Sequence, residues 1–121
     1  MTGQPSTPDE VFADSPGGLE IYRRLLDLMS GLDVAVHTTR SQIALQHRIG
    51  FGYLWYPGRY VGSQVPAVLS FALPERLESP RFKQVGSPAP GMWMHHLELS
   101  DPDDLDDEVL GWLRAAYDAA E

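Results

Sequence analysis

The sequence contains no cysteine, which excludes disulfide bonds and thiolate metal sites and is typical of a cytoplasmic protein. No apolar run approaches the roughly 20 residues that a membrane-spanning helix needs. The first residues also lack the basic segment followed by an apolar one that marks a signal peptide. We therefore expect a cytoplasmic protein without a membrane segment.

Motifs of catalysis and metal binding are also missing. There is no glycine-rich phosphate loop and no nucleophile elbow, and Ser41, Ser70 and Ser79 lie in no sequence context that activates a nucleophile. The four histidines have no recognisable zinc-ligand spacing, and the acidic run 101–108 lacks the glycine and ligand alternation of a calcium loop. We expect no cofactor and no metal, and we favour a domain without catalysis of its own.

The chain nevertheless has enough apolar sequence to fold. Hydrophobic residues make up 43% of its 121 residues, which is typical of a globular domain with its own core. Residues 1–6 form a polar stretch that we expect to be a disordered tail. We interpret residues 7–121 as a single domain, because no repeat or linker divides them.

The centre of the chain holds the strongest pattern. Phe51, Tyr53 and Trp55 fall on one side of an extended chain, and alternate residues from Ala67 to Leu73 repeat the pattern. A Pro-Gly turn and a short polar loop separate the two runs. This arrangement predicts a pair of half-buried strands, joined as a hairpin, at the centre of a sheet.

Amphipathic helices flank this pair. The predicted elements are a short helix from Thr7, a helix over 15–31, strands over 34–37, 42–46 and 92–99, and a final helix over 101–117. Such close strands favour antiparallel neighbours, and both long helices need an apolar surface. We predict an α+β two-layer sandwich in which the N- and C-terminal helices cover one face of a mostly antiparallel sheet of four to five strands. The other face is open to solvent or to a ligand.

A proline-rich connection precedes the last predicted strand. Residues 74–91 contain four prolines, and the pattern predicts a long loop with one helical turn at 75–77. Loops of this length inside a small domain are often functional.

Charge is distributed unevenly along the chain. Residues 39–97 carry six basic and two acidic side chains, whereas both flanking segments are acidic and the whole chain has a net charge of −8. An acidic domain disfavours non-specific nucleic-acid binding, because that affinity comes mostly from phosphate neutralisation. The basic centre can still bind a single anionic group.

Four stretches together resemble the domain of unknown function 5655 family of bacteria. They are Thr7–Phe12, the run Phe-Gly-Tyr-Leu-Trp at 51–55, the run Trp-Met-His-His-Leu at 93–97, and the run Trp-Leu-Arg-Ala-Ala-Tyr at 112–117. The loop between Leu73 and Phe82 adds to the resemblance. It implies a domain of the kind just described, with no established activity and no catalytic residues to carry over. The resemblance also implies that related domains occur next to nuclease-like domains in longer proteins. An accessory role in nucleic-acid binding is therefore a further alternative.

Arginines and aromatic residues form the best candidate binding site. Guanidinium groups bind carboxylate or phosphate in a bidentate manner, and aromatic faces stack on rings. The candidate ligand-binding residues are Arg40, Arg59, Tyr60, Arg81 and Trp93, together with His96. The alternative is that these arginines pair with the acidic C-terminal helix of the same molecule.

His95 and His96 are the candidate acid–base residues. Adjacent residues of a strand point to opposite faces, so the two cannot ligate one metal side by side. His95 shares a face with Trp93 and Leu97, which predicts either a buried core histidine or a proton carrier at the edge of a pocket. His96 faces away from the helices, toward the open face.

The other aromatic residues of the centre have a simpler interpretation. We expect Tyr53, Trp55 and Tyr56 to pack in the core and at the sheet edge rather than to stack on a ligand.

Two functional classes remain. The first is a binding domain for an anionic small molecule or an acidic partner segment, at a rim formed by Arg59 and Arg81. The second is a small enzyme that uses His95 or His96 as acid–base, with an arginine to stabilise an anion. The oligomeric state, monomer or homodimer, stays open.

Overall fold

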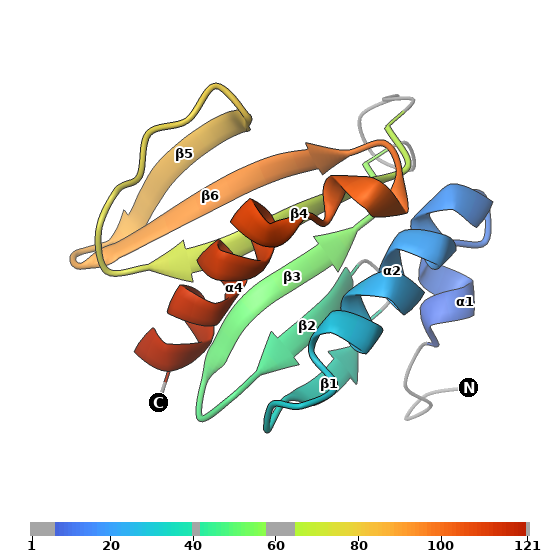
Figure 1. Cartoon of the computed structure of the whole chain (residues 1–121), viewed down its shortest axis with the longest axis horizontal. Coiled ribbons are helices and arrows are strands. Elements are labelled where there is room, and N and C mark those ends of the chain that lie inside the picture. Colours follow the sequence, from blue (N-terminus) through green and yellow to red (C-terminus); the bar gives the residue numbers. More distant parts are fainter. Residues whose placement is uncertain (1–6, 40–41, 58–64, 121) are drawn as a thin grey trace.

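The computed structural model describes residues 7–39, 42–57 and 65–120 of the chain. Figure 1 shows the arrangement of its helices and strands. In chain order these are α1 (Pro8–Val11), α2 (Pro16–Leu28), β1 (Ala35–Thr38), β2 (Gln42–Gln46), β3 (Gly50–Trp55), β4 (Ala67–Leu73), β5 (Phe82–Ala89), β6 (Met92–Leu99), the 3₁₀ turn η1 (Pro102–Asp104) and α4 (Asp107–Ala119).

The strands form one open antiparallel sheet in the order β1-β2-β3-β4-β6-β5. The expected pairing of β3 with β4 is confirmed, and the α+β class is as predicted. The described residues form six strands, so the expectation of four to five strands was too low.

The additional strand is β5, which lies in the segment that the sequence predicts as a loop with one helical turn. Proline cannot donate a ladder hydrogen bond, so it is tolerated only at edges and irregularities of a sheet. β5 is an edge strand, and its register against β6 slips between Gly86 and Ala89, where Pro88 lies. The prolines therefore mark an edge strand here, and the prediction of a loop over 74–91 was wrong for 82–89.

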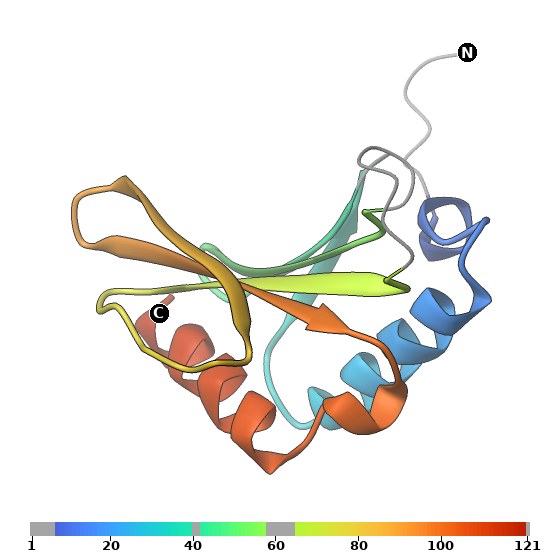
Figure 2. The same ribbon diagram turned by 90° about the horizontal axis from the view of Figure 1, so that it is seen from above.

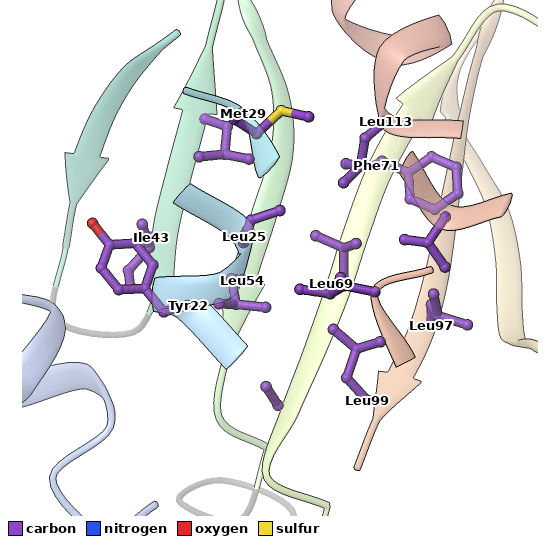
Figure 3. Packing of buried hydrophobic residues seen from close by; sticks show 14 of the residues in the cluster. Tyr22, Leu25, Met29, Ile43, Leu54, Leu69, Phe71, Leu97, Leu99 and Leu113 are labelled. Carbon is purple, nitrogen blue, oxygen red and sulfur yellow. The ribbon is translucent and has the colours of Figure 1, made fainter. Parts of the chain in front are cut away.

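The long helices α2 and α4 lie on one face of the sheet, and no described helix covers the opposite face (Figure 2). Tyr22 and Leu25 of α2, Met29 directly after α2, and Leu113 of α4 pack onto the covered face (Figure 3). The sheet supplies alternate buried residues to this core: Ile43, Leu45, Leu54, Ala67, Leu69, Phe71, Leu73, Leu97 and Leu99. Fully burying each large aliphatic side chain contributes about 1.5–3 kcal/mol, so this layer holds the fold together.

Side chains cap the start of each helix, and one of the predicted helices is divided. Thr7 and Glu10 form a reciprocal capping box at α1, and Ser15 accepts a hydrogen bond from the backbone of Gly18 at α2. The helix predicted over 101–117 is divided. Asp101 caps the turn η1, and Asp106 caps α4 separately.

A β-bulge at the start of β3 changes which side chains share a face. Leu45 pairs with Gly52 but Gln46 pairs with Gly50, so Phe51 has no partner of its own on β2. An extra residue of this kind breaks the period-two alternation. Phe51 therefore packs in the core, edge-on against Tyr117, and the prediction that it shares a face with Tyr53 and Trp55 was wrong.

The loop between β2 and β3 holds the end of α4. The backbone N–H groups of Arg48 and Ile49 donate to the carbonyl of Ala120, and His47 donates through Nδ1 to the carbonyl of Tyr117 at 2.9 Å. The imidazole of His47 also stacks on the ring of Tyr117, with centroids 3.8 Å apart. These bonds satisfy carbonyl groups that a helix leaves free at its C-terminus.

Two glycines in helices provide a matched test of the packing. A methyl group on Gly18 would overlap the ring of buried Phe12 and lie 2.7 Å from the carbonyl oxygen of Pro66, whereas one on Gly111 would meet nothing within 4 Å. We expect Gly18→Ala to lower the free energy of unfolding by about 1–3 kcal/mol through overpacking. Gly111→Ala should raise it by about 0.4–1 kcal/mol, because alanine restricts the unfolded chain. Urea unfolding measures both, and similar values for the two variants would contradict this packing.

Candidate functional site

Arg81 is held by acidic groups of the same molecule. Its Nη1 lies 3.1 Å from Asp106 and 2.9 Å from Glu108, and its Nη2 donates to the carbonyl of Asp104 at 3.0 Å. The guanidinium also lies 5.8 Å from the centre of the Trp112 ring. Glu108 and Asp106 raise the pKa of Arg81, and the hydrogen bond from the Val109 backbone, followed by that from Arg81, lowers the pKa of the Asp106 carboxyl. A ligand at Arg81 would have to displace these partners.

The rest of the predicted arginine site is not brought together in the described structure. Arg40, Arg59 and Tyr60 lie outside the described residues. Trp93 is half-buried, and the guanidinium of Arg76 lies over its ring, 5.9 Å from the ring centre. The role of the predicted cluster in binding therefore stays a prediction.

His95 is fully buried on the covered face of β6. Its Nε2 accepts a hydrogen bond from the backbone N–H of Leu77 at 3.0 Å, so the neutral ring carries its hydrogen on Nδ1. Nδ1 makes no hydrogen bond. The ring stacks on Phe71 at 5.2 Å and lies 5.0 Å from Phe82. A histidine enclosed in this way cannot meet a ligand from solvent.

Burial is the main cause of a lowered pKa at His95. The charged imidazolium loses its hydration in the aromatic cluster, which lowers the pKa below the ordinary histidine value. The backbone carbonyls of Phe71 and Trp93 oppose this shift, although neither completes a hydrogen bond to Nδ1, and the positive charge of Arg76 adds to it. His95 is therefore held neutral.

The open face of the sheet carries a different set of side chains. The strand registers place Tyr53, Ser70 and His96 in one row across β3, β4 and β6, with Gln84 of β5 beyond His96. Trp55 lies across from Gln42 on the neighbouring strand β2. Alternation along each strand directs these residues away from the helices.

A chain of hydrogen bonds joins three residues of this face. The indole Nε1 of Trp55 donates to Oγ of Ser70 at 3.2 Å, and Oγ of Ser70 lies 2.7 Å from Nδ1 of His96. Ser70 is only 4% exposed, so its hydroxyl hydrogen needs an acceptor. Nδ1 of His96 is the acceptor within reach.

This chain selects one tautomer of His96. Indole N–H can only donate, so Ser70 accepts from Trp55 and passes its own hydrogen to Nδ1. The hydrogen of the neutral imidazole then lies on Nε2, which makes no hydrogen bond within the described part of the chain. Burial is the main cause of a lowered pKa at His96, and any proton taken up by neighbouring His95 would lower it further, so the neutral form is favoured.

These residues line a hollow of about 340 Å³ on the open face. The described residues that line it are Gln42, Tyr53, Trp55, Ser70, Met94 and His96. Ligand pockets usually start near ~300 Å³ and combine apolar walls with a few convergent polar groups. The hollow therefore offers two aromatic rings, a thioether and a fixed N–H donor within one small space.

Sequence reasoning placed His96 on the open face but missed its partners. Tyr53 and Trp55 were interpreted as core and edge packing, and Ser70 as a serine without an activating context. The period-two alternation of β4 already puts Ser70 on the face opposite Leu69 and Phe71. A comparison of the residues that face away from the core on neighbouring strands could have identified this group from the sequence.

Other features of the described residues carry less chemistry. They contain no cluster of three or more potential metal ligands. No helix among them is long and apolar enough to cross a lipid bilayer.

Comparison with known protein families gives a match over most of the chain. A family model described as a domain of unknown function (DUF5655) matches residues 9–120. No curated protein and no solved structure shows significant similarity to the chain.

The lowered pKa of His95 predicts an acid-sensitive fold. The unfolded chain takes up a proton below about pH 6.5, whereas the folded chain does so only below its lower pKa. The free energy of unfolding should therefore decrease as the pH is lowered from about 6.5 to the pKa of the folded state. The decrease is up to about 1.4 kcal/mol per pH unit for each such histidine. His96 contributes in the same direction.

We expect His95→Gln to remove its share of this slope, because a glutamine oxygen still accepts the hydrogen bond from Leu77 and cannot be protonated in this range. Urea unfolding between about pH 5 and 7.5 measures the slope. His37→Gln, on the exposed edge strand β1, is the matched control and should follow the wild type. A wild-type slope in His95→Gln would contradict the assignment.

Proposed function

The chain belongs to the DUF5655 family, and we propose that it acts as a small binding domain whose ligand lies in the open-face hollow. The observation that carries this proposal is the hydrogen-bond chain from Trp55 through Ser70 to His96. It holds one N–H donor in a single orientation beside aromatic walls. The core needs none of these three side chains, since they lie on the face away from the helices.

The chemistry of the hollow favours a small ligand with a flat apolar part and a hydrogen-bond acceptor. Tyr53 and Trp55 offer ring faces for stacking, and Met94 offers a polarisable contact. Nε2 of His96 and the amide of Gln42 provide donors for the acceptor. A pre-organised donor costs little side-chain entropy on binding, which favours affinity.

The contacts of Arg81 disfavour a ligand site at the rim that the sequence predicts around Arg59 and Arg81. Three acceptors and the Trp112 ring already surround the Arg81 guanidinium. Breaking such charge-assisted hydrogen bonds would offset the gain from a new anion. We therefore assign Arg81 to joining the segment before β5 to the start of α4.

A second candidate is an enzyme, and the 2.7 Å contact between Ser70 and His96 is the observation that favours it. A serine that donates to a neutral histidine has the first element of a nucleophile and base pair. No Asp or Glu of the described structure supports the other side of His96, and the backbone around Ser70 is engaged in the sheet. Binding without catalysis therefore agrees better with this geometry.

Substitutions at the two sites distinguish the hollow from the arginine rim. We expect small aromatic acids and amides, added to ¹⁵N-labelled protein, to shift the backbone amide signals of β3, β4 and β6 around the hollow. Tyr53→Ala combined with His96→Ala should weaken any such binding by at least about tenfold, because it removes a stacking wall and the fixed donor.

Arg81→Gln is the matched control and should change the affinity by less than about twofold, since Asp106 and Glu108 already hold the Arg81 guanidinium and it does not line the hollow. The reverse result would place the ligand at the rim: weaker binding in Arg81→Gln and unchanged binding in the double variant. Circular dichroism of each variant verifies that the fold is retained.

A further inference from the structure

The described lining of the hollow contains polar groups but no fixed charge. Among residues 7–39, 42–57 and 65–120, those that line it include no lysine, arginine, aspartate or glutamate. The titratable and charged groups that face His96 from the packed strands are Tyr53 of β3, Lys83 of β5, and Glu98 of β6, with His95 behind it on the covered face. Lys83 and Glu98 form an ion pair at 3.0 Å, so neither supplies an unbalanced charge.

Of the described lining residues, His96 is the one whose side chain can gain a proton and a positive charge. Its neutral form offers one donor, the Nε2–H. When Nδ1 also gains a proton, Nδ1 donates to Oγ of Ser70, which already accepts from Trp55. An oxygen with two lone pairs can accept both bonds.

Protonation therefore releases the hydroxyl hydrogen of Ser70. In the neutral state this hydrogen is given to His96, and in the charged state it must find another acceptor. Ser70 lines the hollow, so an acceptor bound there can receive it. One proton thus converts a neutral site with a single donor into a positive site with two donors, Nε2–H of His96 and O–H of Ser70.

A carboxylate matches this second state. Its two oxygens accept two hydrogen bonds, and its charge balances the imidazolium where no described lining residue supplies a countercharge. A flat ring beside the carboxylate would lie against Tyr53 and Trp55. We infer that the hollow takes a ring-bearing carboxylate together with one proton, which His96 acquires as the ligand binds.

This inference rests on the proposed function, and it adds a ligand class and a pH dependence. The carboxylate can belong to a free small molecule or to the C-terminal residue of a peptide. Benzoate represents the first source and N-acetylphenylalanine the second. Benzamide, which has the same ring without the charge, is the neutral control ligand.

The test is the affinity of the three probes as a function of pH, followed by backbone amide chemical shifts between about pH 5.5 and 8. Both carboxylate probes stay ionised over this range, because carboxyl groups ionise at lower pH. We expect carboxylate affinity to rise as the pH falls, by up to about tenfold per pH unit, because each binding event takes up a proton. Benzamide should bind with no such slope. Preference for benzoate or for N-acetylphenylalanine identifies the source.

Two variants locate the proton. His96→Gln should abolish the pH dependence of benzoate binding, while His37→Gln, on the same face at the edge strand β1, should retain it. Benzoate and benzamide binding that shifts the hollow but is equally insensitive to pH would overturn the inference and leave the proposed function intact. Benzoate binding that does not depend on pH and is lost in Arg40→Gln or Arg59→Gln would also overturn it, because an arginine would then bind the carboxylate. Absence of any shift around the hollow with all three probes would overturn both.

Discussion

Burial of one face of the sheet beneath α2 and α4 is the constraint on which the rest of the structure depends. Alternate residues of β4 and β6, such as Leu69 and Leu97, meet the helices and are almost fully removed from water. Because side chains alternate in a strand, this burial fixes the residues between them on the other face. Ser70 and His96 thus face away from the core because their neighbours are committed to it.

The two histidines of β6 lie on opposite faces of the sheet and differ in which ring nitrogen is available to a ligand. His95 lies on the covered face, where aromatic rings enclose it and the Leu77 backbone occupies its Nε2. His96, the next residue, has its Nδ1 occupied by Ser70 and keeps Nε2 available. Burial favours the neutral form of both rings, but only His96 lines a hollow that a ligand can enter.

Features that depend on local alternation could be predicted from the sequence, and features that depend on contacts between distant segments could not. The period of two in β4 and β6 gave the faces of Leu69 and His96 correctly. β5 was missed because prolines disfavour central strands but are tolerated at an edge. The bulge at Phe51 and the bonds of Ser70 to residues 15 and 26 positions away leave no signal in a local pattern. The ion pairs of Arg81 appeared only as one of two alternatives.

The most direct test of this account is the protonation of each ring nitrogen of His96 in the ligand-free protein. A long-range ¹H–¹⁵N correlation spectrum near pH 7.5 assigns it, since the two nitrogens differ strongly in chemical shift when one is bare. The hydrogen-bond chain from Trp55 predicts a bare Nδ1 and a hydrogen on Nε2, and Ser70→Ala should release this preference. A hydrogen on Nδ1 in the wild type would contradict the account, because the hollow would then lack its fixed donor.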